Sequence, residues 1–177
     1  MTDPDPIPDP IPDSDDLARR LLAAARARGL MIATAESCTG GLVSGALTAI
    51  PGASDAFDRG FVTYSYPAKT ELLGVPPEML AAHGAVSEPV ARAMAAGALR
   101  ASSAGLAVAV TGVAGPGGSE TKPEGLVWFA TAVAAGSGNA PIVHAEHRAF
   151  GPLGRDRVRA QSVETALTLA LRALSGN

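Results

Sequence analysis

The sequence predicts a single α/β domain of three layers, with helices on both sides of a mixed β-sheet. Helical and strand-like segments alternate along most of the 177 residues, and a short turn joins two neighbouring strand-like segments near the end. Hydrophobic residues make up 47% of the chain and aromatic residues only 4%, so we expect a core of Ala, Val and Leu. A chain of this length buries enough apolar surface to fold unaided.

Residues 1–13 repeat Asp-Pro and Ile-Pro steps, and we expect them to form a disordered tail because proline removes donors and disfavours helix. The predicted domain then covers residues 14–177. Its first helix is capped by Ser14 and Asp15 and ends at Gly29. The apolar side of this helix is formed by Leu17, Leu21 and Leu22.

Two strand-like segments follow, each leading into a helix. Residues 30–33 are typical of a short buried strand, residues 34–41 connect it to a helix predicted at 41–50, and a turn follows at 51–54. The second strand is predicted at 60–66.

Prolines and glycines set the next boundaries. Pro67 ends the second strand, and a short helix that carries Lys69 ends at Gly74. Residues 76–77, both proline, open another short helix that ends at Gly84.

The second half begins with a strong helix start at residues 87–89, Ser-Glu-Pro, where the serine is expected to cap a helix that runs to about residue 101. The remaining predicted elements are strands at 106–110, 125–133 and 142–150 and a closing helix at 155–174.

Charge and cysteine content limit the possible partners and location. The net charge of −3 and the pI near 5.6 give no electrostatic basis for binding nucleic acid or an anionic membrane. The only cysteine, Cys38, excludes an intrachain disulfide and suits a reducing compartment. No apolar run reaches the roughly 20 residues that span a bilayer, and the start of the chain does not look like a secretory signal. We therefore expect a cytoplasmic protein.

Ser37 lies between the first predicted strand and its helix, at the kind of sheet edge where α/β proteins bind ligands. The amide groups at a helix start favour an anion or a developing oxyanion. A serine needs a base to become a nucleophile, and the local sequence alone favours a serine that simply caps the helix. Cys38 is a competing nucleophile or simply a small buried residue.

Candidate bases are few. The three histidines, at positions 83, 144 and 147, lie in no recognisable triad context, and the last two fall in a predicted edge strand. Lys69 is the alternative, because a lysine can act as a base when burial makes its neutral form accessible. Otherwise Lys69 is a solvated helix residue.

A glycine-rich loop, residues 111–118, follows the third predicted strand. It matches neither a Walker A loop nor a dinucleotide fingerprint. Its amide groups could hold a phosphate or carboxylate, or the loop could be a plain surface turn. Positive charge for a bound anion could come from Lys122, Arg155 and Arg159.

Four motifs occur in a characteristic order: Thr-Ala-Glu-Ser-Cys-Thr-Gly-Gly at 34–41, Gly-Phe-Val-Thr-Tyr-Ser at 60–65 with Lys69 and Leu-Gly-Val at 73–75, His-Gly-Ala-Val-Ser-Glu at 83–88, and Thr-Gly-Val-Ala-Gly-Pro at 111–116. Together they resemble the CinA C-terminal domain family over residues 16–174. Stand-alone members of that family are nicotinamide-nucleotide amidases.

The resemblance implies hydrolysis of the carboxamide of nicotinamide mononucleotide (NMN), which yields nicotinate mononucleotide and ammonia. Ser37 matches the motif serine and is the expected nucleophile, Lys69 the expected general base, and Tyr64 the residue that orients Lys69 or relays a proton. Ser37 and Lys69 are 32 positions apart, so this is not the Ser-x-x-Lys helix of β-lactamases. The resemblance implies no metal and no cofactor, and it suggests a homodimer.

The expected substrate-binding residues belong to two motif segments and the closing helix. Amide groups near 38–41 are expected to form an oxyanion hole, and the loop at 111–115 is expected to bind the nucleotide. The full set comprises Glu36, Cys38, Thr39, Gly40, Gly41, Thr111, Gly112, Ala114, Gly115 and Arg155.

Two features depart from the family pattern. The family usually has Asn-Glu where this chain has Tyr66-Pro67, and the glycine-rich loop is one residue shorter here. Both changes bear on substrate fit. Two other hypotheses remain: a non-catalytic nucleotide-binding module that serves competence or DNA-damage response through protein partners, and a hydrolase that uses Cys38.

Overall fold

The protein forms one five-stranded sheet in the order β2-β1-β3-β4-β5. The computed structural model describes residues 14–136 and 139–175, so the expected tail at 1–13 lies outside the described residues. Strands β2, β1 and β3 are parallel, whereas β4 and β5 are antiparallel to their neighbours. The predicted mixed sheet is confirmed. The strands are β1 (Ile32–Glu36), β2 (Phe57–Val62), β3 (Leu106–Gly112), β4 (Leu126–Val133) and β5 (Ile142–Ala149).

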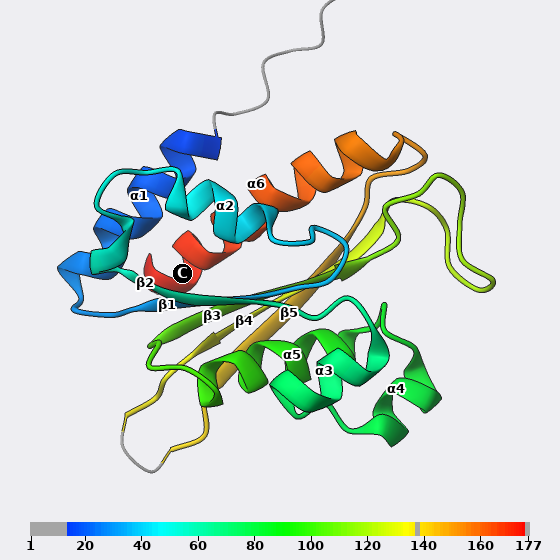
Figure 1. Cartoon of the computed structure of the whole chain (residues 1–177), viewed down its shortest axis with the longest axis horizontal. Helices are drawn as coiled ribbons and strands as arrows, with labels where there is room; N and C mark the ends of the chain where they lie inside the picture. The colour runs from blue at the N-terminus through cyan, green and yellow to red at the C-terminus, as the bar shows by residue number, and fades with distance from the viewer. Residues whose placement is uncertain (1–13, 137–138, 176–177) are drawn as a thin grey trace, which may run out of the picture.

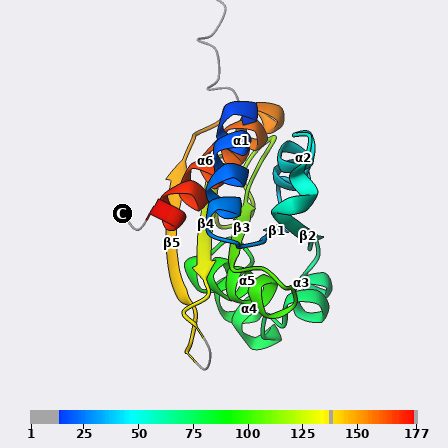
Figure 2. The same cartoon turned by 90° about the vertical axis from the view of Figure 1, so that its left-hand side faces the viewer.

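Helices cover both faces of this sheet, as Figures 1 and 2 show. One face carries α1 (Ser14–Ala27), α2 (Leu42–Thr48) and α6 (Arg155–Ser175), and the other carries α3 (Tyr66–Leu73), α4 (Pro77–His83) and α5 (Glu88–Arg100). Each face has its own apolar cluster, with Leu22, Leu47 and Leu167 in one and Leu73, Met94 and Ala109 in the other. Among the described residues, no helix is long and apolar enough to cross a membrane.

Three strands differ in their bounds from those predicted. β3 runs on to Gly112, so Thr111 and Gly112, expected in the glycine-rich loop, belong to the strand because they pair with β4. β1 starts at Ile32 and continues through Thr34 to Glu36, because it pairs with β2 and β3 on its two sides and its polar side chains find partners in the interior. β2 ends at Val62, before the predicted end at residue 66. Ser37 therefore follows β1 directly, and Tyr64 lies in the connection from β2 to α3.

Most helix ends lie close to the glycine, proline and capping residues that predict them. Gly74 ends α3 in the left-handed conformation with φ of 66°, and the Ser65 side chain accepts a hydrogen bond from the amide of Ala68 at the start of the same helix. Ser87 is the N-cap residue of α5, as expected, but its side chain makes no capping hydrogen bond to the helix. Its hydroxyl donates to the carbonyl of Gly84 at 2.8 Å and forms no cap to the helix.

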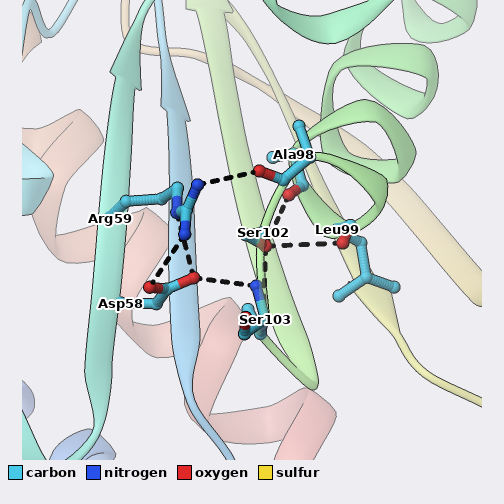
Figure 3. Close-up of polar contacts among 8 residues, drawn as sticks. Asp58, Arg59, Ala98, Leu99, Ser102 and Ser103 are labelled. Atoms are coloured by element: carbon cyan, nitrogen blue, oxygen red, sulfur yellow. Dashed lines mark hydrogen bonds and ion pairs between the residues drawn. The ribbon is translucent and has the colours of Figure 1, made fainter.

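The amino end of β2, an edge strand, is tied to the segment after α5 (Figure 3). Asp58 accepts a 2.8 Å hydrogen bond from the amide of Ser103, and Arg59 pairs with Asp58 and donates to the carbonyl of Ala101 at 3.2 Å. The hydrogen bond from Ser103, with the adjacent Arg59, holds the pKa of Asp58 below its usual value. These contacts fix the register of β2 at the end opposite Ser37.

Candidate active site

Ser37 occupies the carboxyl end of β1, in the centre of the parallel part of the sheet. Its amide donates to the carbonyl of Val110 in β3 at 2.9 Å, which continues the pairing of β1 and β3 by one residue. Its side chain is largely buried, with 8% of the residue exposed. Ser37 does not cap α2. The N-cap residue of this helix is Gly41, which has no side chain to make a capping hydrogen bond.

Lys69 meets Ser37 across the site. Its amine Nζ lies 2.9 Å from the Ser37 Oγ, 2.6 Å from the carbonyl of Thr63 and 3.4 Å from the carbonyl of Tyr64. The side chain has no exposed surface. Burial disfavours the charged form and lowers the pKa of the Lys69 amine to about 8. At mildly alkaline pH a substantial fraction of the Lys69 amine is therefore neutral. A neutral amine can accept a proton from a serine hydroxyl.

The path of the chain between β2 and α3 explains this meeting. The amide of Thr63 donates to the carbonyl of Glu36 at 2.8 Å, which brings the exit of β2 beside the exit of β1. The chain then turns into α3 with Ser65 as N-cap and Pro67 in the first turn. Lys69 follows within the next turn of this short helix, and its side chain points back to the sheet edge.

Glu36 is fully buried and holds the turn that carries Ser37. Its carboxylate accepts hydrogen bonds from the amides of Gly41, Val43 and Ser44 at 3.0, 3.0 and 2.8 Å, and from the Ser44 hydroxyl at 2.7 Å. A carboxylate thereby satisfies the first amide groups of α2. Its oxygens face the protein interior, away from any position open to a substrate.

The turn from Ser37 to Gly41 uses some of the amide groups expected to form an oxyanion hole. The amide of Gly40 donates to the carbonyl of Ser37 at 3.1 Å, and that of Gly41 donates to Glu36. The amides of Cys38 and Thr39 donate to no oxygen of residues 14–136 or 139–175 and interact with the Cys38 sulfur instead. Of the four amides expected to form an oxyanion hole, those of Gly40 and Gly41 therefore already have partners inside the protein.

Cys38 follows the nucleophile candidate but differs from it in chemistry. It is 5% exposed, and burial raises the pKa of its thiol to about 11. Because the thiolate is the nucleophilic form, this burial disfavours Cys38 as a nucleophile at neutral pH.

A second group of predicted residues meets at the rim of the site. The Arg155 guanidinium, at the first position of α6, donates to the Tyr64 hydroxyl at 3.1 Å and to the carbonyl of Gly115 at 3.0 Å. Tyr64 is 60% exposed, so its ring is open to a ligand. Its carbonyl contacts Lys69, and its hydroxyl contacts Arg155.

The other predicted loop residues are more enclosed. Thr111 is fully buried and its hydroxyl donates to the carbonyl of Ala85 at 2.9 Å, which anchors the segment after α4. Gly112 ends β3, where an added Cβ would overlap Val127, and Ala114 is 4% exposed.

Two contributors were not singled out from the sequence. Thr63 acts through its main-chain carbonyl, which any residue type would supply, so the sequence carried no signal for it. Arg159, suggested only as a source of charge, reaches from α6 to the carbonyl of Thr39 at 3.1 Å and so supports the Ser37 turn.

His144 and His147 lie on β5, separated from β1 by two strands. The described residues contain no group of three or more His, Cys, Asp or Glu side chains arranged for a metal ion.

The chain resembles known proteins over nearly all of its described length. A family model, the CinA C-terminal domain, matches residues 14–174. The nicotinamide-nucleotide amidohydrolase PncC of Escherichia coli K12 is 51% identical over 152 residues, which cover 85% of this chain and 88% of that protein. A putative competence-damage inducible protein of Symbiobacterium thermophilum is 49% identical over 168 residues, which cover 89% of this chain.

These relatives differ in length, and solved structures share the fold. The chain spans 37% of the length of the Symbiobacterium protein. The crystal structure of the competence/damage inducible protein CihA from Agrobacterium tumefaciens superposes with a TM-score of 0.85 at 49% identity, over 92% of this chain and 96% of that one. With a family match across residues 14–174 and about half of the aligned residues identical to those of E. coli PncC, the chain belongs to the CinA C-terminal domain family.

Proposed function

We propose that this protein is an amidohydrolase that converts NMN to nicotinate mononucleotide and ammonia, with Ser37 as nucleophile and Lys69 as general base. The observation that carries the proposal is the 2.9 Å contact between the Lys69 amine and the Ser37 hydroxyl in a buried setting. The substrate is inferred from the similarity to E. coli PncC, whose name describes a nicotinamide-nucleotide amidohydrolase.

The first half-reaction forms an ester on Ser37. Neutral Lys69 accepts the hydroxyl proton as Oγ bonds to the carboxamide carbon, and the carbonyl electrons move to oxygen. The amides of Cys38 and Thr39 are the proposed donors for that oxyanion. When the carbon–nitrogen bond breaks, the Lys69 ammonium returns the proton to the leaving nitrogen, and ammonia departs.

In the second half-reaction, a water molecule enters the position vacated by ammonia and hydrolyses the ester. Lys69 accepts a proton from the water as its oxygen bonds to the ester carbon. The bond from that carbon to the Ser37 Oγ then breaks, Lys69 returns the proton to Oγ, and nicotinate mononucleotide leaves. The carbonyls of Thr63 and Tyr64 hold the amine in position through both halves.

Substrate contacts are assigned to the rim. We propose that Arg155 binds the phosphate, since a guanidinium pairs well with phosphate oxygens, and that Tyr64 packs beside the nucleotide. Gly112, Ala114 and Gly115 shape the same wall from the end of β3 and the loop that follows it. Glu36 is given a supporting role here, in place of the substrate contact expected from the sequence, because its carboxylate is enclosed.

The decisive experiment measures ammonia and nicotinate mononucleotide release from NMN, in the presence of EDTA, by the wild type and by Ser37→Ala and Cys38→Ala variants. We expect Ser37→Ala to lose about 10³-fold or more of the turnover while it keeps its circular dichroism spectrum. Cys38→Ala is expected to stay active, and its loss of activity would favour a cysteine hydrolase. Near-normal turnover by Ser37→Ala refutes the proposal. Saturable NMN binding by calorimetry with no product from the wild type would support the non-catalytic binding module.

We further propose that the protein is a cytoplasmic homodimer without direct nucleic-acid binding. The net charge of −3 and the single cysteine support the location and the lack of nucleic acid. Family resemblance supports the dimer. Several large apolar side chains of α2, β2, α3 and the segment between β2 and α3 are also exposed, namely Leu42, Val62, Tyr64, Tyr66 and Leu72. Multi-angle light scattering at micromolar concentration tests it, and a monomer mass contradicts it.

A further inference from the structure

Glu124 joins two walls of the candidate site. It lies in the connection between β3 and β4, and its two carboxylate oxygens accept separate hydrogen bonds. Oε2 accepts from the amide of Gly117 in the glycine-rich loop at 2.6 Å, and Oε1 accepts from the amide of Gly154 at 2.9 Å. Gly154 directly precedes α6, so one side chain links the loop to the start of that helix.

A second link runs in parallel with the first. Arg155 follows Gly154 and donates to the carbonyl of Gly115, two residues before Gly117. Gly115 has φ of +86°, and a Cβ added there would overlap the Glu124 carboxylate. The loop therefore passes directly over the carboxylate, and a glycine is needed at residue 115 for that approach.

The same contacts change the expected role of the loop. Free amides in a glycine-rich loop and before a helix are suited to an anionic ligand. In this protein the amides of Gly117 and Gly154 already have an internal anion as partner, the Glu124 carboxylate. These two groups are thus occupied, and the Arg155 guanidinium is a positive group at this wall that can meet a substrate anion.

We infer that Glu124 is a positioning residue, which fixes the glycine-rich loop to the start of α6 and so aims Arg155 at the anionic end of the substrate. This inference rests on the proposed function, in which Arg155 binds the phosphate of NMN. Glu124 touches neither Ser37 nor Lys69, so its effect belongs to substrate binding and not to the chemical steps.

Steady-state kinetics with NMN test the role through the separate values of KM and kcat. Glu124→Ala is expected to raise KM about tenfold, the loss of one well-aimed charged contact, and to change kcat by no more than about twofold. Glu124→Gln keeps one acceptor oxygen and is expected to fall between Ala and wild type. The matched control is Glu120→Ala, because Glu120 is an exposed carboxylate of the same loop with no hydrogen bond to residues 14–136 or 139–175; its KM is expected to equal that of the wild type.

A double-mutant cycle connects the effect to Arg155. Once Arg155→Ala has removed the guanidinium, adding Glu124→Ala is expected to raise KM by less than about twofold more. Equal increments in the two backgrounds, or a KM for Glu124→Ala that matches Glu120→Ala, overturn the inference. A fall in kcat with unchanged KM overturns it as well.

Amide hydrogen exchange separates this inference from the proposed function. In Glu124→Ala the amides of Gly117 and Gly154 are expected to exchange at least about tenfold faster than in wild type, and the side-chain resonance of Arg155 is expected to move. If the wild type does not hydrolyse NMN, the proposed function fails. The exchange rates and the Arg155 resonance still report on whether Glu124 holds the loop against the start of α6. If exchange and the Arg155 resonance are unchanged in Glu124→Ala, the positioning role of Glu124 is rejected, whether or not the protein turns over NMN.

Discussion

Lys69 is a buried amine whose neighbours are two carbonyls and one hydroxyl. Two carbonyls accept from its N–H groups in either protonation state, while the contact to Ser37 reverses direction when the amine loses its proton. Neutral Lys69 becomes the acceptor and the Ser37 hydroxyl becomes the donor. The geometry therefore leaves one direction free for proton transfer, and this direction points at the Ser37 hydroxyl, the proposed nucleophile.

The pH dependence of activity follows from the lowered pKa of Lys69. The neutral amine is the base in the proposed mechanism, so kcat/KM is expected to rise about tenfold per pH unit in the acid range and to level off above about pH 8. Lys69→Met, which keeps an unbranched side chain one atom shorter and removes the amine, is expected to be inactive at every pH. A profile that is flat between pH 6 and 9 contradicts the assignment of Lys69 as base.

The same shift has a consequence for stability. The unfolded chain binds a proton at Lys69 up to about pH 10.5, whereas the folded protein releases it near pH 8. Between these values the unfolded state holds more protons, so the free energy of unfolding is expected to rise with pH. Below pH 8 the buried charge opposes folding, and Lys69→Met is expected to have a melting temperature at least as high as that of the wild type at pH 7 by calorimetry.

Tyr64 contributes through two different atoms. Its carbonyl contacts Lys69 and its hydroxyl contacts Arg155. Tyr64→Phe removes only the second contact, so we expect kcat to be nearly unchanged and KM for NMN to rise roughly threefold. A large loss of kcat would instead indicate proton relay by the hydroxyl. Tyr66→Phe is a suitable control, because that hydroxyl contacts the amide of Ala85 and not Arg155.

At the level of elements, β1, the turn after it and α2 form one unit around Glu36. The helix has only seven residues, too few to be stable alone, and its first amide groups are satisfied by a carboxylate from the strand. Gly60 of β2 packs against this unit, since an added Cβ would overlap the Ser44 hydroxyl. The position of Ser37 is thus set by the junction of three elements.

Glu36→Gln tests this junction. The amide nitrogen cannot accept the hydrogen bonds that one carboxylate oxygen receives, so we expect a loss of about 1–3 kcal/mol in the free energy of unfolding and a lower kcat. For a domain of this size, the melting temperature is expected to fall by roughly 2–4 °C per kcal/mol. Glu71→Gln, at an exposed position of α3, serves as control. An unchanged melting temperature would show that the network is not needed to hold the turn.

At the level of the whole molecule, the candidate site draws on segments from most of the chain. The turn after β1, the start of α3, the end of β3 and the start of α6 meet at the edge where parallel strands end. Residue 14 opens α1, which packs on α6, and we propose that the folding domain starts there.

Removal of residues 1–13 tests the proposed domain boundary. All contacts described for the site lie between residues 34 and 159, so the shortened chain is expected to keep the kcat, the KM for NMN and the melting temperature of the full chain. Urea unfolding of both chains, with the midpoint as readout, provides the comparison. A shift in the midpoint would assign residues 1–13 a role in the folded domain.

The sequence by itself determined the three-layer fold, the order of the elements and most helix ends, and it singled out Ser37, Lys69 and Arg155 as candidate site residues. Periodicity, glycine and proline are local signals, because they act through the backbone of a few neighbouring residues. Boundaries failed where non-local pairing prevailed, as in β1, whose polar Thr34 and Glu36 are buried by strands on both sides.

Only the tertiary structure decided which of these groups meet. Ser37 and Lys69 are 32 positions apart, and their 2.9 Å contact depends on β2 lying beside β1. The burial that lowers the pKa of Lys69, the enclosure of Glu36 and the occupation of loop amides by Glu124 are likewise properties of the packed chain. Distance and solvent exposure arise from contacts between remote segments, and a linear sequence carries no direct record of them.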